Sequence, residues 1–326
     1  MKKFLIIRFS SIGDIVLTTP MIRCIKTQFN CELHFLTKKE FSSILINNPY
    51  IDKLFAYDNN LKQLVNQLKA ENYDYIIDLH NNIRSHLIKF RLFKPYTCVR
   101  KLNFLKWLIV NFKINLLPKV HIVDRYFDAA KKLNIANDNA GLDYFISKTD
   151  EIDIKTLPES HQCQYIAFVI GAKHFTKQIP INLLIEICKQ ITKPIILLGD
   201  KQDEEKGNFI HKEIGQNIYN ACGKYSLNQS AFLIKNADKV VTADTGLMHI
   251  AAAFNKKTIS LWGNTIPAFG MYPYMPKNTS NSVIFENNNL KCRPCSKLGY
   301  QQCPKKHFNC MNQLNVIEII NIINND

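Results

Sequence analysis

The 326-residue sequence lacks any uninterrupted run of 18 apolar residues, the length that a membrane-spanning helix needs. It also lacks the pattern of a secretion signal, because Arg8 breaks the first apolar stretch and residues 10–14 are polar. These absences predict a cytoplasmic chain without a membrane span. The length and the 46% hydrophobic content are typical of a globular protein with two domains of ordinary size.

Acidic residues are scarce relative to basic ones. The 42 lysines and arginines outnumber the 27 aspartates and glutamates, so the formal net charge is +15. Such an excess favours a polyanionic partner: a phosphorylated substrate, an anionic membrane surface or nucleic acid. Because the chain has no Arg-rich tail, the case for nucleic acid rests on bulk charge alone, and we expect no nucleic-acid partner. Solvated lysines in a composition rich in Lys and Asn are the alternative explanation.

Cysteine is plentiful, yet a disulfide framework is not expected in a cytoplasmic chain. Six of the ten cysteines are scattered and are most simply core residues. The other four form a C-x2-C-x7-C-x6-C pattern, and their thiolates match a closed tetrahedral Zn²⁺ site. These four are Cys292, Cys295, Cys303 and Cys310. A structural zinc ion would stabilise this polar segment, which lacks a core of its own. The alternatives are packed free thiols or a disulfide, and His307 complicates the ligand count.

Strand-like apolar runs alternate with helical patterns, which predicts an α/β fold with parallel sheets flanked by helices. The expected strands are 3–8, 32–36, 53–56, 75–79, 165–170, 194–198, 218–220, 239–242 and 258–261. The principal expected helices are 15–28, 61–71, 183–190, 204–214, 226–236 and 316–324. A polar stretch between Ser147 and Gln164 separates two Rossmann-like domains, 1–155 and 156–326. The last helix is a candidate to pack back on the first domain.

One turn, residues 242–249, stands out because it follows a short apolar strand and opens an Ala-rich helix. Asp244, Thr245 and Gly246 occupy the turn, and His249 falls in the first helical turn. Unpaired backbone N–H groups at a helix start, together with a hydroxyl and an imidazole, suit a phosphate group. An Asp or Thr helix cap beside a surface histidine is the alternative.

Four segments taken in order resemble a known family. They are Arg8-Phe9-Ser10-Ser11-Ile12-Gly13-Asp14, 78–85, 176–180 and 243–252, of which Ser-x-Gly-Asp and Asp-Thr-Gly-x-x-His are the most specific pieces. The set resembles the lipopolysaccharide heptosyltransferases of glycosyltransferase family nine. The resemblance implies a GT-B fold, with two Rossmann-like domains facing each other across a cleft. It also implies inverting, metal-independent transfer from ADP-heptose, held by the C-terminal domain, to a lipid-anchored sugar acceptor at the inner membrane.

For the acceptor side, the resemblance implies that Asp14 is the general base. Its place at the carboxyl end of the first strand agrees with where open α/β sheets bind ligands. The alternative role is the N-cap of a helix beginning at Ile15. Arg84 has the planar donor fork that suits an anionic acceptor group. The acceptor-binding set that we expect is Ser11, Gly13, Asn82 and Arg84.

For the donor side, the departing diphosphate must be met by protein donors if no metal is used. Lys177 supplies a full charge, Thr176 a hydroxyl and the Thr245–Gly246 turn its backbone N–H groups. An acidic group for the ribose is expected after the strand 194–198, where Asp203 is preferred over Asp200. The donor-binding set that we expect is Thr176, Lys177, Asp203, Asp244, Thr245, Gly246 and His249.

Three positions depart from the family pattern. Ile170 stands where Pro often occurs, Ile179 where Trp is common and Asn264 where many members have Pro. Because these sites line the donor pocket, transfer from another nucleotide sugar is the alternative within the fold. A basic nucleic-acid-binding protein with a zinc knuckle is the alternative from a different class. The basic and aromatic stretch 96–115 is a candidate for contact with the membrane or the acceptor, or else a solvated face.

Overall fold

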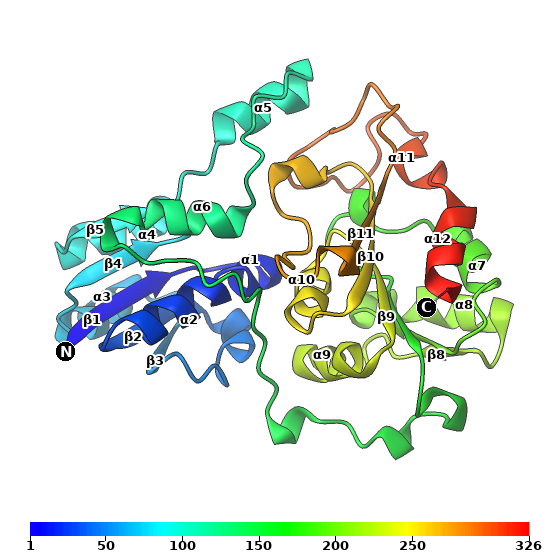
Figure 1. The fold of residues 1–326 in the computed structure, drawn as a ribbon, viewed down its shortest axis with the longest axis horizontal. Coiled ribbons are helices and arrows are strands. Elements are labelled where there is room, and N and C mark those ends of the chain that lie inside the picture. The colour runs from blue at the N-terminus through cyan, green and yellow to red at the C-terminus, as the bar shows by residue number, and fades with distance from the viewer. Residues whose placement is uncertain (326) are drawn as a thin grey trace. The chain divides into compact units, whose positions relative to one another are not determined.

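The computed structural model describes residues 1–325, and in it the chain forms two compact units. Unit 1 comprises Met1–Leu102 and Val120–Phe145, and unit 2 comprises Asn103–Lys119 and the chain from Ile146 onward. Each unit contains one parallel sheet with helices on its faces (Figure 1). The last boundary between the units falls between Phe145 and Ile146, ahead of the break that we expect after residue 155, and residues 103–119 also belong to the second unit.

The sheet of unit 1 has the order β3-β2-β1-β4-β5, and every pairing is parallel. Its strands are β1 (Lys2–Ile7), β2 (Cys31–Lys38), β3 (Lys53–Tyr57), β4 (Tyr75–Asp78) and β5 (Tyr96–Cys98). Most of β1 is fully buried, as expected for a strand covered on both faces. The order reverses between β1 and β4, so the carboxyl ends of these two strands form the crevice where such sheets bind ligands.

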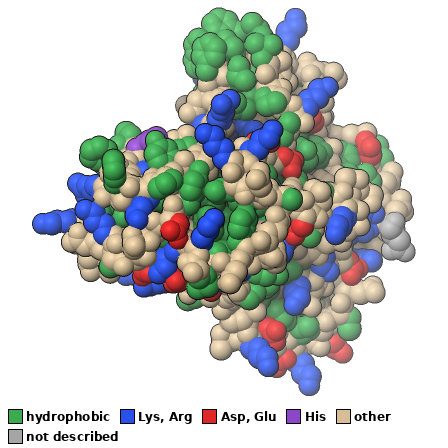
Figure 2. Space-filling model, turned by 60° about the vertical axis from the view of Figure 1, so that its left-hand side comes forward, with side chains coloured by type: hydrophobic (Ala, Val, Ile, Leu, Met, Phe, Trp, Pro, Cys, Tyr) green, Lys and Arg blue, Asp and Glu red, His purple; other side chains and the backbone are tan. Residues whose placement is uncertain are grey.

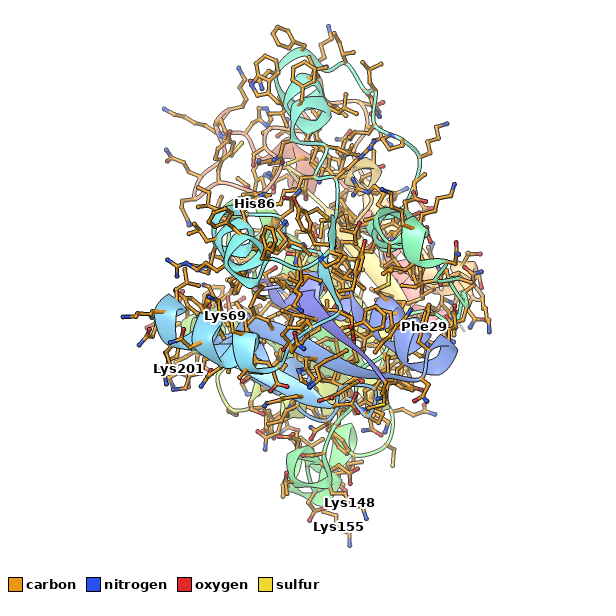
Figure 3. The ribbon with its side chains drawn as sticks, turned by 90° about the vertical axis from the view of Figure 1, so that its left-hand side faces the viewer. Phe29, Lys69, His86, Lys148, Lys155 and Lys201 are labelled. Carbon is orange, nitrogen blue, oxygen red and sulfur yellow. The ribbon has the colours of Figure 1, made fainter. Side chains whose placement is uncertain are left out.

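The helices of unit 1 are α1 (Ile12–Val16), α2 (Thr19–Gln28), α3 (Leu61–Ala70), α4 (Ile83–Leu92) and α6 (Ile122–Ala129). The single helix expected over 15–28 is wrong, because the structure has α1 and α2 with a break at residues 17–18. Pro20 lies at the start of α2 and has no N–H to continue the helical ladder. Exposed side chains such as Lys69 on α3 and His86 on α4 mark the outer faces of these helices (Figure 3).

The sheet of unit 2 has the order β11-β10-β9-β6-β7-β8 and is also parallel throughout. Its strands are β6 (Ile166–Val169), β7 (Ile195–Leu198), β8 (Ile218–Asn220), β9 (Lys239–Ala243), β10 (Lys257–Trp262) and β11 (Ser282–Glu286). If the six strands are numbered 1 to 6 along the chain and the sheet is read from β8 to β11, the order is 3-2-1-4-5-6, the doubly wound arrangement of dinucleotide-binding sheets. The reversal lies between β6 and β9, and the candidate phosphate turn follows β9.

The helices of unit 2 are α5 (Asn103–Phe112), α7 (Ile181–Cys188), α8 (Glu204–Ile214), α9 (Leu227–Asn236), α10 (Gly246–Ala253), α11 (Asn309–Asn312) and α12 (Val316–Asn324). The last helix, α12, contacts α7 and buries Ile319, Ile320 and Ile323 in the core of this unit. Among residues 1–325, no helix combines the length and the apolar character needed to cross a membrane.

Candidate active site

In unit 1, the carboxylate of Asp14 lies beyond the carboxyl end of β1 and is held from both sides. The Arg8 guanidinium forms an ion pair with one carboxylate oxygen, Oδ1. The Ser11 hydroxyl donates to the other oxygen, Oδ2, at 2.8 Å. Arg8 is itself fixed, because it also donates to the carbonyls of Ser10 (2.8 Å) and Leu79 (2.5 Å). The carboxylate is therefore oriented and electrostatically stabilised by its own neighbours.

Asp14 is the third residue of α1, so it is not the N-cap of a helix beginning at Ile15. Ser11 occupies the N-cap position, and its hydroxyl and backbone N–H both donate to the Asp14 carboxylate. Gly13, which we expected near the acceptor, is buried within α1. The local sequence thus makes a short helix whose first turn presents a carboxylate at the ligand-binding edge of the sheet.

His80 lies beyond the end of β4, and its ring meets the Phe9 ring edge-on at 5.5 Å between centroids. Burial lowers the pKa of His80 to about 4, and the positive charges of Arg8 and Lys101 act in the same direction. Burial opposes the charge of Arg8, but its pKa is raised overall because nearby negative groups, Asp14 foremost, outweigh that penalty. At neutral pH this edge of unit 1 therefore combines a neutral imidazole with a charged Arg8–Asp14 pair.

The two other acceptor-side candidates have different roles in the structure. Asn82 caps α4: its side-chain oxygen accepts from the Ser85 backbone N–H at 2.8 Å, which commits that oxygen to the fold. Arg84 lies over the rings of Phe9 (5.3 Å) and Tyr57 (4.7 Å), and these contacts hold its planar guanidinium in place. Of the two, Arg84 has the charge that an anionic acceptor would need.

In unit 2, the turn after β9 has the geometry that the sequence predicts. Helix α10 begins at Gly246, and Thr245 occupies its N-cap position without a side-chain cap hydrogen bond. The Thr245 hydroxyl instead lies 3.1 Å from that of Thr242. The first amides of α10 are therefore not capped by the Thr245 side chain, and the positive end of the helix dipole adds to their attraction for an anion. His249 is in this helix and is 3% exposed.

Lys177 and Asp244 form an ion pair at this edge, with 2.6 Å between Nζ and Oδ2. The hydroxyl of Thr265, which follows β10, donates to the same Asp244 oxygen at 2.8 Å. The side chains of Lys177 and Asp244 are 19% and 13% exposed, so both remain accessible. An ammonium group thus lies beside the turn that opens α10.

Thr176 and Asp203 are both buried and engaged within the protein. Thr176 exchanges hydrogen bonds with the backbone of Tyr300, so its hydroxyl is already committed. Asp203 accepts from the Asp200 backbone N–H at 3.0 Å, and burial raises its pKa. A side chain at Gly171 would place Cβ only 2.0 Å from the Asp203 carboxylate, so Asp203 packs directly against the loop after β6. The structure brings Asp203 to the ligand-binding edge, where it also has a structural role.

The cysteine segment, residues 292–310, brings its four thiols into one region without closing a metal site. Among the residues described, no three of these sulfur atoms lie within 4.8 Å of one another. Cys292 Sγ lies 3.9 Å from His307 Nε2, and the Cys295 thiol donates to the Cys292 carbonyl at 3.2 Å. Burial raises the pKa of Cys310 to about 12, and the other cysteines of the cluster add to that shift. The thiols are therefore neighbours electrostatically, and a tetrahedral set would need the segment to tighten.

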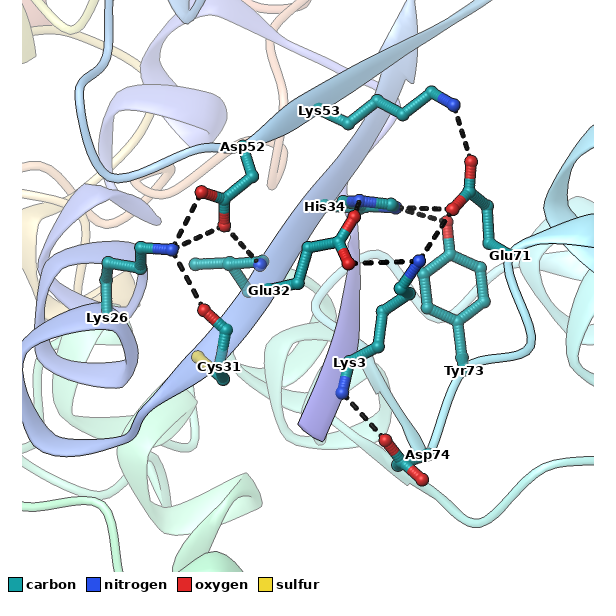
Figure 4. A network of polar contacts seen from close by, with 11 residues as sticks. Lys3, Lys26, Cys31, Glu32, His34, Asp52, Lys53, Glu71, Tyr73 and Asp74 are labelled. Carbon is teal, nitrogen blue, oxygen red and sulfur yellow. Dashed lines mark hydrogen bonds and ion pairs between the residues drawn. The ribbon is translucent and has the colours of Figure 1, made fainter. Parts of the chain in front are cut away.

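A different group, Glu32, His34 and Glu71, does have metal-like spacing among the residues described (Figure 4). Its oxygen atoms are already occupied by ammonium groups: Lys3 lies 3.0 Å from Glu32 and 2.9 Å from Glu71. Hydrogen bonds from Lys53 and Lys3 lower the pKa of Glu71 to about 2. The group lies toward the amino ends of β1 and β2, away from the ligand-binding edge. It is an ion-pair network rather than a candidate metal centre.

Sequence reasoning missed several residues that lie at or beside these candidates: Arg8, His80, Thr265, Tyr300 and Arg293, whose guanidinium donates to the Thr265 carbonyl at 2.8 Å. A signal existed for Thr265, because it follows a predicted strand beside the phosphate turn. Arg8 also ends a predicted strand, but its pairing with Asp14 depends on the path of the intervening loop. Arg293 and Tyr300 come from the cysteine segment, whose contacts no local pattern predicts.

Comparison with known proteins identifies the family. The model of glycosyltransferase family 9 (heptosyltransferase) matches residues 61–301, which is more than half of the chain. The chain belongs to glycosyltransferase family 9. It is therefore a glycosyltransferase, as the quoted motifs led us to expect, and the nucleic-acid-binding alternative is not favoured.

A curated relative within this family is lipopolysaccharide heptosyltransferase 1 of Campylobacter coli. It is 26% identical over 288 residues, which cover 81% of this chain and 84% of the relative. Two solved structures from E. coli share the fold, each with a TM-score of 0.70 and 20% identity. The match to ADP-heptose LPS heptosyltransferase II covers 98% of this chain and 99% of the chain in that structure. The match to heptosyltransferase WaaC with ADP covers 98% of this chain and 98% of the chain in that structure. These likenesses establish the GT-B fold that the sequence predicts.

Proposed function

We propose that this glycosyltransferase transfers a heptose from ADP-heptose to a lipopolysaccharide inner-core acceptor, with inversion and without a catalytic metal. Family membership supports the reaction class, and the names of its relatives suggest the donor and the acceptor. The observation that carries the mechanism is the Lys177–Asp244 pair at the uncapped start of α10. That arrangement offers a cation and oriented amides to a departing diphosphate.

In unit 1, Asp14 is the proposed general base. Its carboxylate accepts the proton of the acceptor hydroxyl while that oxygen attacks the anomeric carbon of the heptose. Arg8 and Ser11 hold the carboxylate in one orientation, so little reorganisation is needed at the moment of reaction. Arg84 is proposed to contact an anionic group of the acceptor, because its guanidinium is held flat on Phe9 and Tyr57.

In unit 2, the bond between the anomeric carbon and the diphosphate oxygen breaks, and the negative charge moves to the departing ADP. Lys177 and the first amides of α10 are proposed to meet that charge, with His249 as a further donor. Asp203 is proposed to contact the ribose from the loop after β7. The Thr176 hydroxyl is bonded to the Tyr300 backbone, so we propose that Thr176 supports the loop that carries Lys177 and does not bind the diphosphate through its hydroxyl.

A thermal-shift panel tests the donor assignment. Nucleoside diphosphates and their sugar conjugates are added singly, and a ligand at one hundred times its Kd should stabilise the folded state by about 2.7 kcal/mol. We expect ADP and ADP-heptose to raise Tm, and UDP or GDP conjugates to have no effect. A response to another nucleotide sugar alone would support the alternative donor. Ile170, Ile179 and Asn264, whose departure from the family pattern suggested that alternative, are each only 1% exposed, so the structure places them in the interior rather than on an open pocket wall. A transfer assay with the responding donor then checks the reaction.

We further propose that the protein is cytoplasmic and binds the inner-membrane surface, where a lipid-anchored acceptor resides. Helix α5 supports this location, because three aromatic side chains on it are exposed: Phe104 (68%), Trp107 (50%) and Phe112 (58%). The Trp107 ring contacts both neighbours, with centroids 6.1 Å and 5.3 Å away. Figure 2 shows hydrophobic side chains gathered on this surface with Lys and Arg side chains beside them.

The charge around α5 agrees with an anionic bilayer. Residues 103–119, the part of the chain around α5 that belongs to the same unit, contain no Asp or Glu and carry Lys106, Lys113 and Lys119. A basic side chain near an anionic surface contributes about 1 kcal/mol of attraction. Aromatic rings with a polar edge favour the interface between headgroups and acyl chains.

Vesicle sedimentation tests this location. We expect the protein to bind vesicles that contain an anionic lipid, and the double substitution Phe104→Ser with Trp107→Ser to weaken binding. Phe209→Ser is the matched control, because Phe209 is a similarly exposed (48%) aromatic residue on α8. Equal binding by the α5 variant and the control would refute α5 as the contact surface.

For the cysteine segment we propose a structural Zn²⁺ held by Cys292, Cys295, Cys303 and Cys310. Four thiolates fit zinc and also suit iron, and elemental analysis of the purified protein distinguishes these metals. We expect about one ion per chain, and chelation should lower Tm. Cys163→Ser is the matched control for Cys295→Ser, because Cys163 is exposed and outside the cluster. Metal-free protein with full stability would leave packed thiols as the explanation.

A further inference from the structure

The cysteine segment is hydrogen-bonded to the loop that follows β10. Arg293 is buried, and its guanidinium donates to the carbonyls of Gly263 (2.5 Å) and Thr265 (2.8 Å). The backbone N–H of Cys295 donates to the Asn264 carbonyl at 3.2 Å. Three successive carbonyls of this loop are therefore held by one short stretch of the cysteine segment.

The same segment is bonded to the loop that follows β6. The Tyr300 backbone N–H donates to the Thr176 hydroxyl at 2.8 Å, and the Thr176 backbone N–H donates back to the Tyr300 carbonyl at 3.1 Å. The neighbouring Gly299 has φ +127°, and a Cβ there would lie 2.6 Å from Cβ of His174. A glycine is thus required where these two chain segments approach each other.

Both sets of hydrogen bonds lead to the same pair of side chains, Lys177 and Asp244. The first route runs through Thr265, whose hydroxyl donates to Asp244 at 2.8 Å. The second runs through Thr176, which is adjacent in sequence to Lys177, the partner of Asp244 at 2.6 Å. Residues 263–265 have no helix or strand, and the stretch around Thr176 has only a short 3-10 turn over 175–177, so regular secondary structure alone does not fix these segments.

We propose that Arg293 and Tyr300 are positioning residues of the donor site, acting through the Gly263–Thr265 loop and through Thr176. The cysteine segment holds Lys177 and Asp244 in the geometry that receives the diphosphate. A site ordered in advance binds more tightly, because the ligand does not have to order the loops itself. The inference rests on the proposed function, since it takes the Lys177–Asp244 pair as the place where the donor diphosphate binds.

Arg293→Lys tests the inference, because it keeps the positive charge but loses the fork that reaches two carbonyls. Arg293 also pairs with the carboxylate of Glu286 at 2.8 Å. Arg23→Lys is therefore the matched control, because Arg23 is likewise buried and paired with a carboxylate, that of Asp138, but lies in unit 1. Both variants should have a lower Tm. By calorimetry we expect Arg293→Lys to bind ADP about tenfold more weakly, the effect of losing one hydrogen bond from a charged group. Arg23→Lys should bind ADP as the parent does.

Hydrogen exchange without any ligand separates the positioning role from the choice of donor. In Arg293→Lys, we expect faster exchange of the backbone amides of Thr176 and Asn264 than in the parent or in Arg23→Lys. If the parent does not bind ADP, the proposed donor is wrong, and the exchange rates still decide the positioning role. Exchange at these two amides that is as slow in Arg293→Lys as in the parent would overturn the inference. If the parent binds ADP, an Arg293→Lys variant that binds ADP equally tightly would overturn it as well.

A second pair of variants covers the case in which Arg293→Lys does not fold. Tyr300→Pro removes the backbone N–H that donates to Thr176, whereas Tyr300→Ala keeps it and serves as the control. Both variants lose the half-exposed Tyr300 side chain and the hydrogen bond of its hydroxyl to the Cys295 carbonyl (3.2 Å), so they differ at the backbone N–H. Weaker ADP binding and faster Thr176 exchange in Tyr300→Pro, but not in Tyr300→Ala, support the inference. Equal behaviour of the two variants contradicts it.

Discussion

The two units each present an aspartate beyond a strand that borders the reversal point of the sheet, and the two aspartates are held differently. Asp14 follows β1 and pairs with Arg8, whose guanidinium is also fixed by two backbone carbonyls. Asp244 follows β9 and pairs with Lys177, a flexible side chain with a single charged head. One pair presents a carboxylate fixed by an arginine, and the other presents a cation.

This difference separates two chemical tasks. An arginine with its donor fork engaged stays in place and orients the carboxylate beside it. A lysine ammonium is a compact point charge on a mobile stem, so it can turn from Asp244 toward a phosphate oxygen. The same doubly wound scaffold therefore presents a fixed carboxylate in unit 1, our proposed base, and an ammonium group in unit 2, our proposed partner of the diphosphate.

The largest effect is expected for Asp14→Asn, which removes the proposed base but keeps the shape of the side chain. We expect the turnover number to fall by about two to four orders of magnitude, because the acceptor hydroxyl loses its proton acceptor. Steady-state transfer assays measure the change. Asp58→Asn, at an exposed carboxylate just after β3, is the control and should keep parent activity. Near-normal turnover of Asp14→Asn would leave Asp14 with a structural role in α1 only.

The next effect is on Lys177→Met, which should weaken ADP binding by about tenfold or more because a charged hydrogen bond is lost. The loss should be much smaller for adenosine, which lacks the diphosphate. Lys201→Met is the control, since the Lys201 side chain is 77% exposed beside the same unit's β7 loop. Calorimetry with both ligands gives the comparison, and equal losses for ADP and adenosine would place Lys177 outside the diphosphate site.

A smaller effect is expected for His249→Ala, because an imidazole carries a full charge only when protonated. We expect ADP affinity to fall about threefold to tenfold, which corresponds to one ordinary hydrogen bond. Adenosine affinity should be unchanged. Because His249 is buried, circular dichroism must show that the variant is folded before the affinity is interpreted. Unchanged ADP affinity in folded protein would make His249 a packing residue of α10.

The smallest expected effect is a pH dependence of stability that arises from His80 in unit 1. The folded pKa of His80, about 4, lies below its ordinary value of 6.5, mainly because of burial. Between these two pH values the unfolded chain binds a proton that the folded chain does not, so stability falls as the pH is lowered through this window. After allowance for partial solvent screening, we expect the free energy of unfolding to fall by about 1 kcal/mol across this window. Denaturant unfolding at pH 7 and pH 5 measures it.

His80→Gln should remove this part of the pH dependence, and His86→Gln should not. His86 is the matched control because its side chain is exposed on the nearby helix α4 (Figure 3). An identical loss of stability between pH 7 and pH 5 in the parent and in His80→Gln would contradict the assignment.

Local pattern was enough to predict most of the fold. Buried parallel strands produce continuous apolar runs, so strands such as β6, β8 and β9 were found within a residue or two of their ends. The strands β5 and β11 were missed, because each is at a sheet edge and only partly buried. The expected helix over 15–28 was wrong because the sequence periodicity continues across Pro20 while the backbone ladder does not.

The candidate sites were predicted where one loop carries the chemistry. The turn at Asp244–Gly246 and the position of Asp14 after β1 follow from strand-to-helix order alone. The partners of these residues come from distant loops: Thr265 contacts Asp244, and Arg8 reaches Asp14 only because the chain turns back after β1. The same limit applies to Arg293, whose partners become neighbours only when β10, β11 and the cysteine segment are folded together.

The most direct test of the division between the units is the ADP affinity of the Asp14→Asn variant. Calorimetric titration of ADP into this variant should give the Kd of the parent, because the base in unit 1 has no part in holding the diphosphate. A Kd weakened to the level of Lys177→Met would contradict the account, since it would show that the carboxylate and the diphosphate site cannot be assigned to separate units.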